Sequence, residues 1–214
     1  MFDLDGVLVD SEQLWNEAKH ELVVQTGGNW REDAPRAMMG MSSLEWSAYL
    51  HDELGVPLPV DEINGQVVAR IERMYREQLP LLPGAVEAVR SLGARWPLGL
   101  ASSSNREIID FVLGLAGLRD AFEATVSSEE VARGKQAPDV SLEAARRVGV
   151  APERCVALED SSNGLRAAVA AGMTVIAVPN PHYPPDEDAL ALAAARVEVV
   201  GEVTPELLER ASRP

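Results

Sequence analysis

Two aspartates stand two positions apart in the apolar opening of the chain, MFDLDGVLVDSE. In an extended backbone Asp3 and Asp5 would point to the same face, because side chains alternate along a strand. Two carboxylates this close cannot both stay ionised in apolar surroundings without a cation or a shared proton. A divalent metal meets that need, and hard carboxylate oxygens suit Mg²⁺, which also binds substrate phosphate. The spacing therefore favours a magnesium site at the end of a first strand.

A second acidic pair, Glu159 and Asp160, follows the apolar run CVAL. It occupies the same kind of position, the carboxyl end of a strand. Asp160 or the following Ser161 could instead simply cap the next helix. Two acidic strand ends in one sheet favour a shared site over a cap alone. Asp10 has a plainer interpretation, because an aspartate followed three residues later by Gln13 is typical of a helix N-cap.

Polar residues follow two further predicted strands. The run LASSSN places Ser102, Ser103 and Ser104 between a strand and a helix, where hydroxyls, backbone N–H groups and a helix N-terminus form a ready anion site. Lys135 follows the next strand in a turn-rich stretch and supplies a cation. Each signal is weak alone, since serines cap many helices and a loop lysine is usually solvated. Together with the acids they indicate a site for a phosphate and a metal.

The chain from residue 84 onward alternates helical periodicity with short apolar runs. Helices are predicted at 84–95, 105–118, 139–150 and 163–173, and strands at 97–101, 123–127, 155–158 and 174–178. With residues 1–4 as the first strand, this alternation is typical of an α/β fold with a doubly wound, Rossmann-like parallel sheet. Ligands of such sheets bind beyond the carboxyl ends of the strands. Only two residues precede Asp3, so we expect the first strand to begin earlier than the sequence shown.

The segment 11–81 differs, because it has helical periodicity and no credible strand. Three amphipathic helices are predicted here, one at 11–25, one at 44–54 behind a capping box of Ser42 and Glu45, and one capped by Asp61. We therefore expect a small α-helical cap at 11–81, inserted into a Rossmann-like core formed by 1–10 and 82–214.

The charge balance limits the partners. The chain has 34 acidic and 19 basic residues and a formal net charge of −15, which argues against general binding to nucleic acid or to an anionic membrane. No apolar run could span a bilayer, no leader resembles a signal peptide, and the single Cys155 cannot form an internal disulfide. We expect a cytoplasmic protein, a monomer or weak dimer, that binds neither nucleic acid nor membrane.

Four ordered motifs carry a family resemblance. DxDGxxxDS at the start, a serine-containing strand end, GKxxPD around Lys135 and LEDSxxG around Asp160 resemble the four motifs of the haloacid dehalogenase superfamily of phosphohydrolases. The helical insert resembles the subclass with a small helical cap, which includes β-phosphoglucomutase and, most similar here, bacterial 2-deoxyglucose 6-phosphate and related sugar-phosphate phosphatases. Gln136 departs from the family, which often has proline there, and we expect it to alter only the turn.

The resemblance implies a role for each motif. Asp3 would attack phosphorus and form an aspartyl-phosphate, and Asp5 would protonate the leaving alcohol and then deprotonate the attacking water. The phosphoryl oxygens would be held by Ser102, the Ser103 amide and Lys135. The metal, Mg²⁺, would be held by Asp3, the Asp5 carbonyl, Asp160 and, directly or behind them, Glu159.

Three activities share these motifs. Dehalogenases lack the second aspartate, so Asp5 speaks against dehalogenation. Mutases of the β-phosphoglucomutase type resemble the core, but this chain has Trp15 where they place a histidine, and Met39, Gly40 and Ser43 where they place a lysine, a glycine and, shortly after, an arginine. We therefore predict a phosphomonoesterase for a small phosphorylated metabolite, a sugar phosphate, with a phosphosugar mutase as the alternative. A non-catalytic phospholigand-binding protein is the alternative from another class.

The cap is expected to select the substrate. Its candidate contacts are Glu12, Trp15 and Ser43. Aromatic side chains at helical spacing are more often core than ligand contacts, so Trp15 could either stack on a sugar or pack within the helical bundle.

Overall fold

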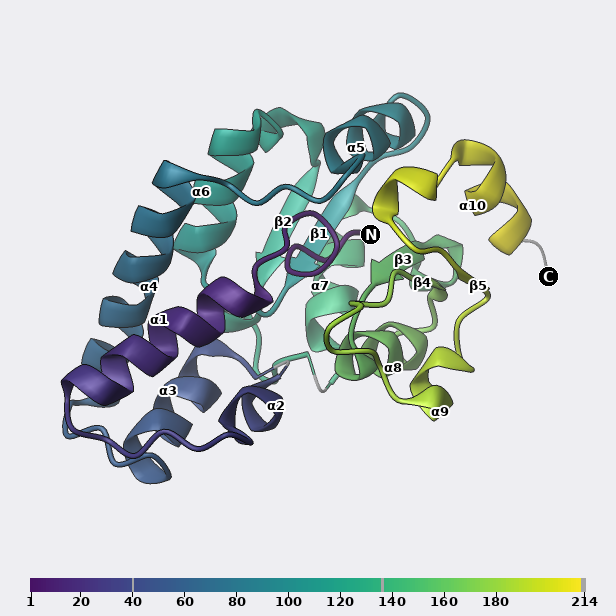
Figure 1. The fold of residues 1–214 in the computed structure, drawn as a ribbon. Coiled ribbons are helices and arrows are strands. Elements are labelled where there is room, and N and C mark those ends of the chain that lie inside the picture. Colours follow the sequence, from purple (N-terminus) through teal and green to yellow (C-terminus); the bar gives the residue numbers. More distant parts are fainter. Residues whose placement is uncertain (40, 136, 213–214) are drawn as a thin grey trace.

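The computed structural model describes residues 1–39, 41–135 and 137–212, so the predictions that concern Gly40 and Gln136 lie outside the described residues. A parallel sheet lies at its centre, and four helices gather at one side of it (Figure 1). The strands are β1 (Gly99–Ser102), β2 (Ala124–Ser127), β3 (Val156–Glu159), β4 (Thr174–Ala177) and β5 (Ala195–Arg196).

The opening segment joins two ladders into one sheet. β1 pairs with β2, while β3, β4 and β5 pair in that order, all in parallel. Phe2 forms parallel bridges to Leu100 of β1 and to Leu158 of β3. Its backbone N–H donates to the carbonyl of Gly99 at 2.8 Å, and the N–H of Leu158 donates to the carbonyl of Met1 at 2.9 Å. The first residues therefore lie between β1 and β3, where the predicted first strand belongs.

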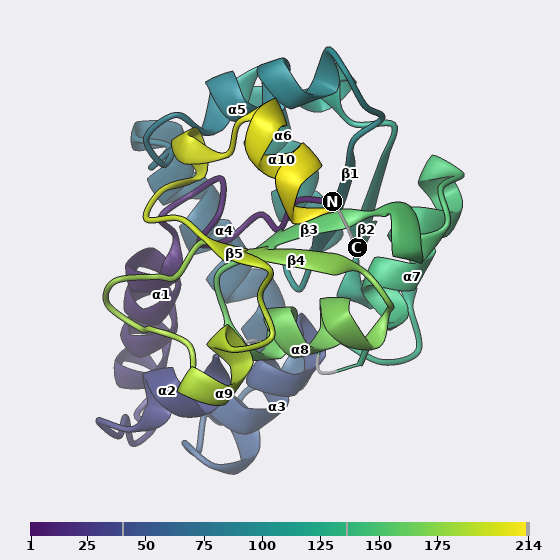
Figure 2. The same ribbon diagram turned by 90° about the vertical axis from the view of Figure 1, so that its right-hand side faces the viewer.

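Helices cover both faces of the sheet, as Figure 2 shows. The core helices are α5 (Ala85–Gly93), α6 (Arg106–Ala116), α7 (Asp139–Val148), α8 (Ser162–Ala170), α9 (Glu187–Leu190) and α10 (Pro205–Ala211). Helices α5, α6 and α10 lie on one face and α7 and α8 on the other. Strand residues alternate accordingly: Leu158 and Ile176 join the larger hydrophobic cluster, while Ala157 and Val175 join a second one beside α8. The predicted doubly wound α/β fold is confirmed.

The helices at the side of the sheet form the cap. They are α1 (Glu12–Gln25), α2 (Ala34–Met38), α3 (Ser43–Asp52) and α4 (Val60–Glu77). Helix α4 buries Ile63, Val67 and Ile71 and packs against α1 and α3. The predicted capping box of Ser42 and Glu45 is present at the start of α3. The cap limits of 11 and 81 stay a prediction.

Two predicted N-caps are wrong. Helix α1 begins at Glu12 with Ser11 as its N-cap, and Asp10 lies exposed before it. The hydroxyl of Ser11 makes no capping bond, because Ser11 has helical φ and ψ where an N-cap residue is usually extended; the hydroxyl donates to Asp5. Helix α4 begins at Val60 behind Pro59, so Asp61 lies within the first turn. A carboxylate there still favours the helix through its dipole.

Candidate active site

Three charged side chains meet in the interior at the carboxyl ends of the strands. Asp3 follows the segment between β1 and β3, Glu159 ends β3, and Lys135 lies in the loop before α7. The ammonium of Lys135 is 2.7 Å from Asp3 Oδ2 and 2.8 Å from Glu159 Oε1. All three residues are buried, with at most 6% of their surface exposed. The lysine therefore links two strand ends, as the sequence predicted for a shared site.

Burial and an excess of carboxylates over ammonium groups shift the pKa values of this cluster. Burial alone would lower the pKa of Lys135, but Asp3 and Glu159 raise it above its ordinary value. Burial raises the pKa of Glu159 to about 8 against the opposing effect of Lys135. Burial and the nearby Asp3 and Glu159 likewise raise the pKa of Asp160. One ammonium faces three carboxylates, so the cluster favours a further cation or bound protons.

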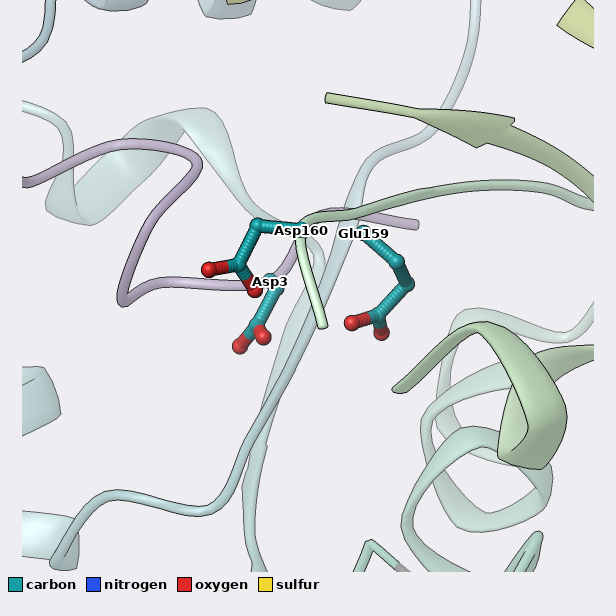
Figure 3. Close-up of side chains that lie close together, drawn as sticks. All are labelled: Asp3, Glu159 and Asp160. Carbon is teal, nitrogen blue, oxygen red and sulfur yellow. The ribbon is translucent and has the colours of Figure 1, made fainter. Parts of the chain in front are cut away.

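The donor set fits a hard divalent cation. Asp3, Glu159 and Asp160 each offer one carboxylate oxygen, and these oxygens lie within 4.8 Å of one another. Figure 3 shows the two adjacent residues Glu159 and Asp160 on either side of the chain, with Asp3 close to Asp160. Across the described residues, no donor is hydrogen-bonded to the Asp160 carboxylate. Oxygen ligands and uncompensated negative charge are what Mg²⁺ binds in proteins.

Two glycines make room for the acids. Gly6 has φ +74°, and a Cβ there would lie 1.8 Å from Asp160 Oδ2. A Cβ on Gly164, in the first turn of α8, would lie 2.0 Å from Glu159 Oε2. The helix is capped by Ser161, whose hydroxyl accepts from the N–H of Gly164 at 3.1 Å. Asp160 is therefore not the cap. It lines a cavity between the sheet and the cap helices, the central cavity.

Asp5 lies beside this cluster in a cage of donors. Its Oδ1 accepts from the hydroxyl of Ser11 and, at 3.2 Å, from the indole N–H of Trp15. Its Oδ2 accepts from the hydroxyl of Ser104. Burial raises the pKa of Asp5; the donors Ser104 and Ser11 oppose that rise, and the charge of Asp3 adds to it. A fixed carboxyl group with a raised pKa is suited to proton transfer.

The three serines after β1 differ in their positions: Ser102 is buried behind the cavity, whereas Ser103 and Ser104 line it. The hydroxyl of Ser102 is fully buried and accepts from the N–H of Ser104 at 3.0 Å, so Ser102 does not line the cavity. Ser103 does line it, and its buried hydroxyl has no hydrogen-bond partner among the residues described. Of the three predicted phosphate ligands, the structure brings Ser103 and Lys135 to the cavity and leaves Ser102 behind it. Ser104, which the sequence placed in the same anion site, also lines the cavity, and its contact with Asp5 was not predicted.

The cavity between core and cap has a volume of about 90 Å³. Two of the three predicted cap residues, Glu12 and Trp15, line it, and Trp15 both packs in the bundle and contacts Asp5. Lys19 also lines it and was not predicted. Its position one turn beyond Trp15, on the same helical face, could have indicated that Lys19 also lines the cavity.

Ser43 lies elsewhere, at a polar bridge between cap and core. Its hydroxyl donates to Glu129 Oε1 at 2.7 Å, and Ser43 does not line the cavity. The same oxygen accepts from the Asn105 amide at 2.8 Å, and Glu129 Oε2 accepts from the backbone N–H of Arg106 at 2.9 Å. The Asn105 amide also donates to Asn64 of α4 at 3.1 Å. This cap–core bridge holds α3 and α4 against the start of α6.

Comparison with known proteins identifies the family. The chain belongs to the haloacid dehalogenase-like hydrolase family, whose model matches residues 1–172. Hexitol phosphatase B of Escherichia coli (strain K12) is 38% identical over 187 residues, covering 85% of this chain and 83% of that protein. Fructose-1-phosphate phosphatase YqaB of the same organism is 30% identical over 178 residues, covering 83% and 94%.

A solved structure extends the likeness to the whole fold. The crystal structure of CbbY from Rhodobacter sphaeroides in complex with phosphate has a TM-score of 0.86, with 28% identity and 97% of each chain covered. The predicted family and the predicted hydrolase class are thereby confirmed. Within the residues that the structure describes, no helix is both long and apolar enough to cross a membrane.

Proposed function

We propose that this hydrolase is a Mg²⁺-dependent phosphomonoesterase that acts on small sugar phosphates through an aspartyl-phosphate intermediate. The observation that carries the proposal is the contact of the buried Asp3 carboxylate with Lys135, beside Glu159 and Asp160. Relatives that are named phosphatases of hexitol phosphate and of fructose 1-phosphate support the substrate class.

Asp3 is the proposed nucleophile. Its Oδ1 accepts from the N–H of Leu4 at 2.7 Å and its Oδ2 contacts Lys135, so the carboxylate is held in one orientation. One of its oxygens attacks phosphorus, the phosphorus–oxygen bond to the alcohol breaks, and water later releases phosphate from the acyl phosphate. Two displacements through a covalent intermediate replace one more difficult displacement.

Asp5 is the proposed acid and base. Its raised pKa lets it hold a proton for the leaving alcohol in the first step. As a carboxylate it then takes a proton from the attacking water. Donors from Ser11, Trp15 and Ser104 fix its position through both steps. Proton transfer of this kind contributes roughly 10²–10⁴-fold to rate.

The remaining groups would bind the phosphoryl oxygens and the metal. The unpartnered hydroxyl of Ser103, with its amide and Lys135, would hold phosphoryl oxygens, and Ser102 would support that loop from behind. The proposed magnesium ligands are Asp3, Asp160, Glu159 and the Asp5 carbonyl. The metal would neutralise charge on the phosphoryl group, which matters in a protein whose formal net charge is −15.

Phosphate release tests the proposal. The assay compares sugar phosphates, polyol phosphates, nucleotides and phosphoglycolate, with Mg²⁺ or with EDTA, for wild type, Asp3→Asn and the control Asp10→Asn. Asp10 is an exposed aspartate of the same motif, so its variant controls for loss of a carboxylate. Magnesium-dependent release by wild type and Asp10→Asn, abolished in Asp3→Asn, is the expected result. Turnover by Asp3→Asn at the wild-type rate, or no release from any ester by wild type, would contradict it.

A further inference from the structure

The chain uses lysine in an unusual way. Only two of its 19 basic residues are lysines, and the other 17 are arginines. Both lysines, Lys19 of α1 and Lys135, are buried, with 6% and 3% of their surface exposed. Both line the central cavity. Lys135 is explained by its two carboxylate partners, whereas the proposed mechanism gives Lys19 no task.

Lys19 is held by aromatic rings and not by an acid. Its ammonium lies 5.6 Å from the ring centroid of Trp15 and 5.2 Å from that of Trp46. Glu12 and Asp5 act on its charge from a distance, but in the described part of the chain no carboxylate forms an ion pair or hydrogen bond with it. The rings attract the charge, yet among the residues that the structure describes they leave the three N–H donors without conventional acceptors.

Lys19 lies further along α1 than the residue that contacts Asp5. Glu12, Trp15 and Lys19 follow the spacing of one helical face, and all three line the cavity. The indole N–H of Trp15 reaches Asp5, while Lys19 lies about 6 Å further along the helix axis at 1.5 Å rise per residue. Figure 1 shows α1 leading away from the sheet. Lys19 therefore enters the cavity from one turn further along α1 than Trp15, the residue that reaches Asp5.

We infer that Lys19 is a specificity-determining residue, which donates to a hydroxyl of a polyol or sugar chain several bonds away from the phosphoryl group. This inference rests on the proposed function. A second phosphate is disfavoured beside Lys19, because the carboxylates of Glu12 and Asp5 lie near enough to act on its charge and would repel another anion.

Glu12 and the aromatic pair complete the fit to a hydroxylated chain. The Glu12 carboxylate lines the same cavity and can accept from a neighbouring hydroxyl. The rings of Trp15 and Trp46 lie 6.0 Å apart at 57° and form an apolar wall beside the ammonium. A donor, an acceptor and an apolar wall together match the alternating C–H and O–H groups of a polyol.

Substrate discrimination tests the inference. Wild type, Lys19→Met and the control Arg73→Met are assayed with three esters: a hexitol 6-phosphate, a hexose bisphosphate and phenyl phosphate, which has no hydroxyl. Arg73→Met removes one positive charge from an exposed position of α4. We expect Lys19→Met to lower kcat/KM for the hexitol phosphate about tenfold to hundredfold, mainly through KM, as loss of a charged hydrogen bond predicts. Turnover of phenyl phosphate should stay within about twofold of wild type, as should all rates of the control.

The other outcomes overturn the inference in distinguishable ways. Equal losses on the hexitol phosphate and phenyl phosphate would mean that Lys19 acts through the catalytic centre or the fold. No loss on either would remove its role in recognition. A loss largest for the bisphosphate would show that Lys19 binds a second phosphate. If wild type hydrolyses none of the esters, the proposed function itself fails, and the inference about Lys19 fails with it.

Discussion

Replacing Gly164 by alanine should reverse the usual effect of that substitution in a helix. Gly164 lies in the first turn of α8 and has no positive φ, so intrinsic propensity alone predicts a gain of about 0.5–1 kcal/mol in stability. A Cβ there would lie 2.0 Å from Oε2 and 2.7 Å from Cδ of Glu159. The carboxylate must therefore move away from Lys135, which it contacts at 2.8 and 3.0 Å.

The magnitude follows from the burial of that ion pair. Above pH 8, where Glu159 is ionised, breaking a buried pair costs roughly 3–5 kcal/mol, so after the helical gain we expect a net loss of about 2–4 kcal/mol for Gly164→Ala. Activity should fall as well, because Glu159 positions the lysine that contacts Asp3. The control is Gly65→Ala in α4, where an added Cβ meets nothing within 4 Å, and we expect it to gain about 0.5–1 kcal/mol.

Urea unfolding followed by circular dichroism measures both variants, and phosphate release measures their activity. Shortening the acid should relieve the overlap, so the cost of Gly164→Ala should shrink when it is combined with Glu159→Asp. If Gly164→Ala gained stability as Gly65→Ala does and kept full activity, the assignment of Glu159 to a fixed buried position would be refuted.

Three further predictions address the metal, the cap and the acid. The pKa of Glu159 is raised from 4.5 to about 8, so its contribution to stability is fully present below pH 4.5 and is lost as the pH rises through about 8. Magnesium favours the ionised form, and the rise in Tm on adding it should be larger at pH 8 than at pH 5; equal rises would count against the site. Glu129→Ala removes the bonds that join Ser43 to the core and should lower kcat/KM at least about tenfold; unchanged kinetics would show that the bridge does not control the cap. Asp5→Asn should lower kcat/KM, which reports the first displacement, by roughly 10²–10⁴-fold on sugar phosphates but less on p-nitrophenyl phosphate, whose leaving group needs no proton; equal losses in kcat/KM would contradict its role as an acid.

The sequence was sufficient to predict the sheet and its acidic edge. Short apolar runs that alternate with helical periodicity predicted β1 to β4 within two residues at either end. Asp3, Lys135 and Glu159 could be brought together in advance because the carboxyl ends of parallel strands share one edge of a sheet. The two residues of β5 and the five of α2 were too short for any period to detect.

Other features depend on contacts that periodicity does not encode. Lys19 was missed because a charged residue in an amphipathic helix usually faces solvent, and only the pair of tryptophans above it explains its burial. The bond between Ser43 and Glu129 joins residues 86 positions apart. Asp10 was predicted as a cap from its spacing alone, whereas α1 begins one residue later, behind Ser11.

The most direct test of the account is to trap the covalent intermediate on Asp3. Enzyme turning over a sugar phosphate with Mg²⁺ is quenched in acid and treated with borohydride, which reduces an acyl phosphate to an alcohol, and the peptides are examined by mass spectrometry. We expect conversion of Asp3 to homoserine only when substrate is present, with Asp5 and Asp10 unmodified. Phosphate release without any modification of Asp3, or modification at another carboxylate, would contradict it.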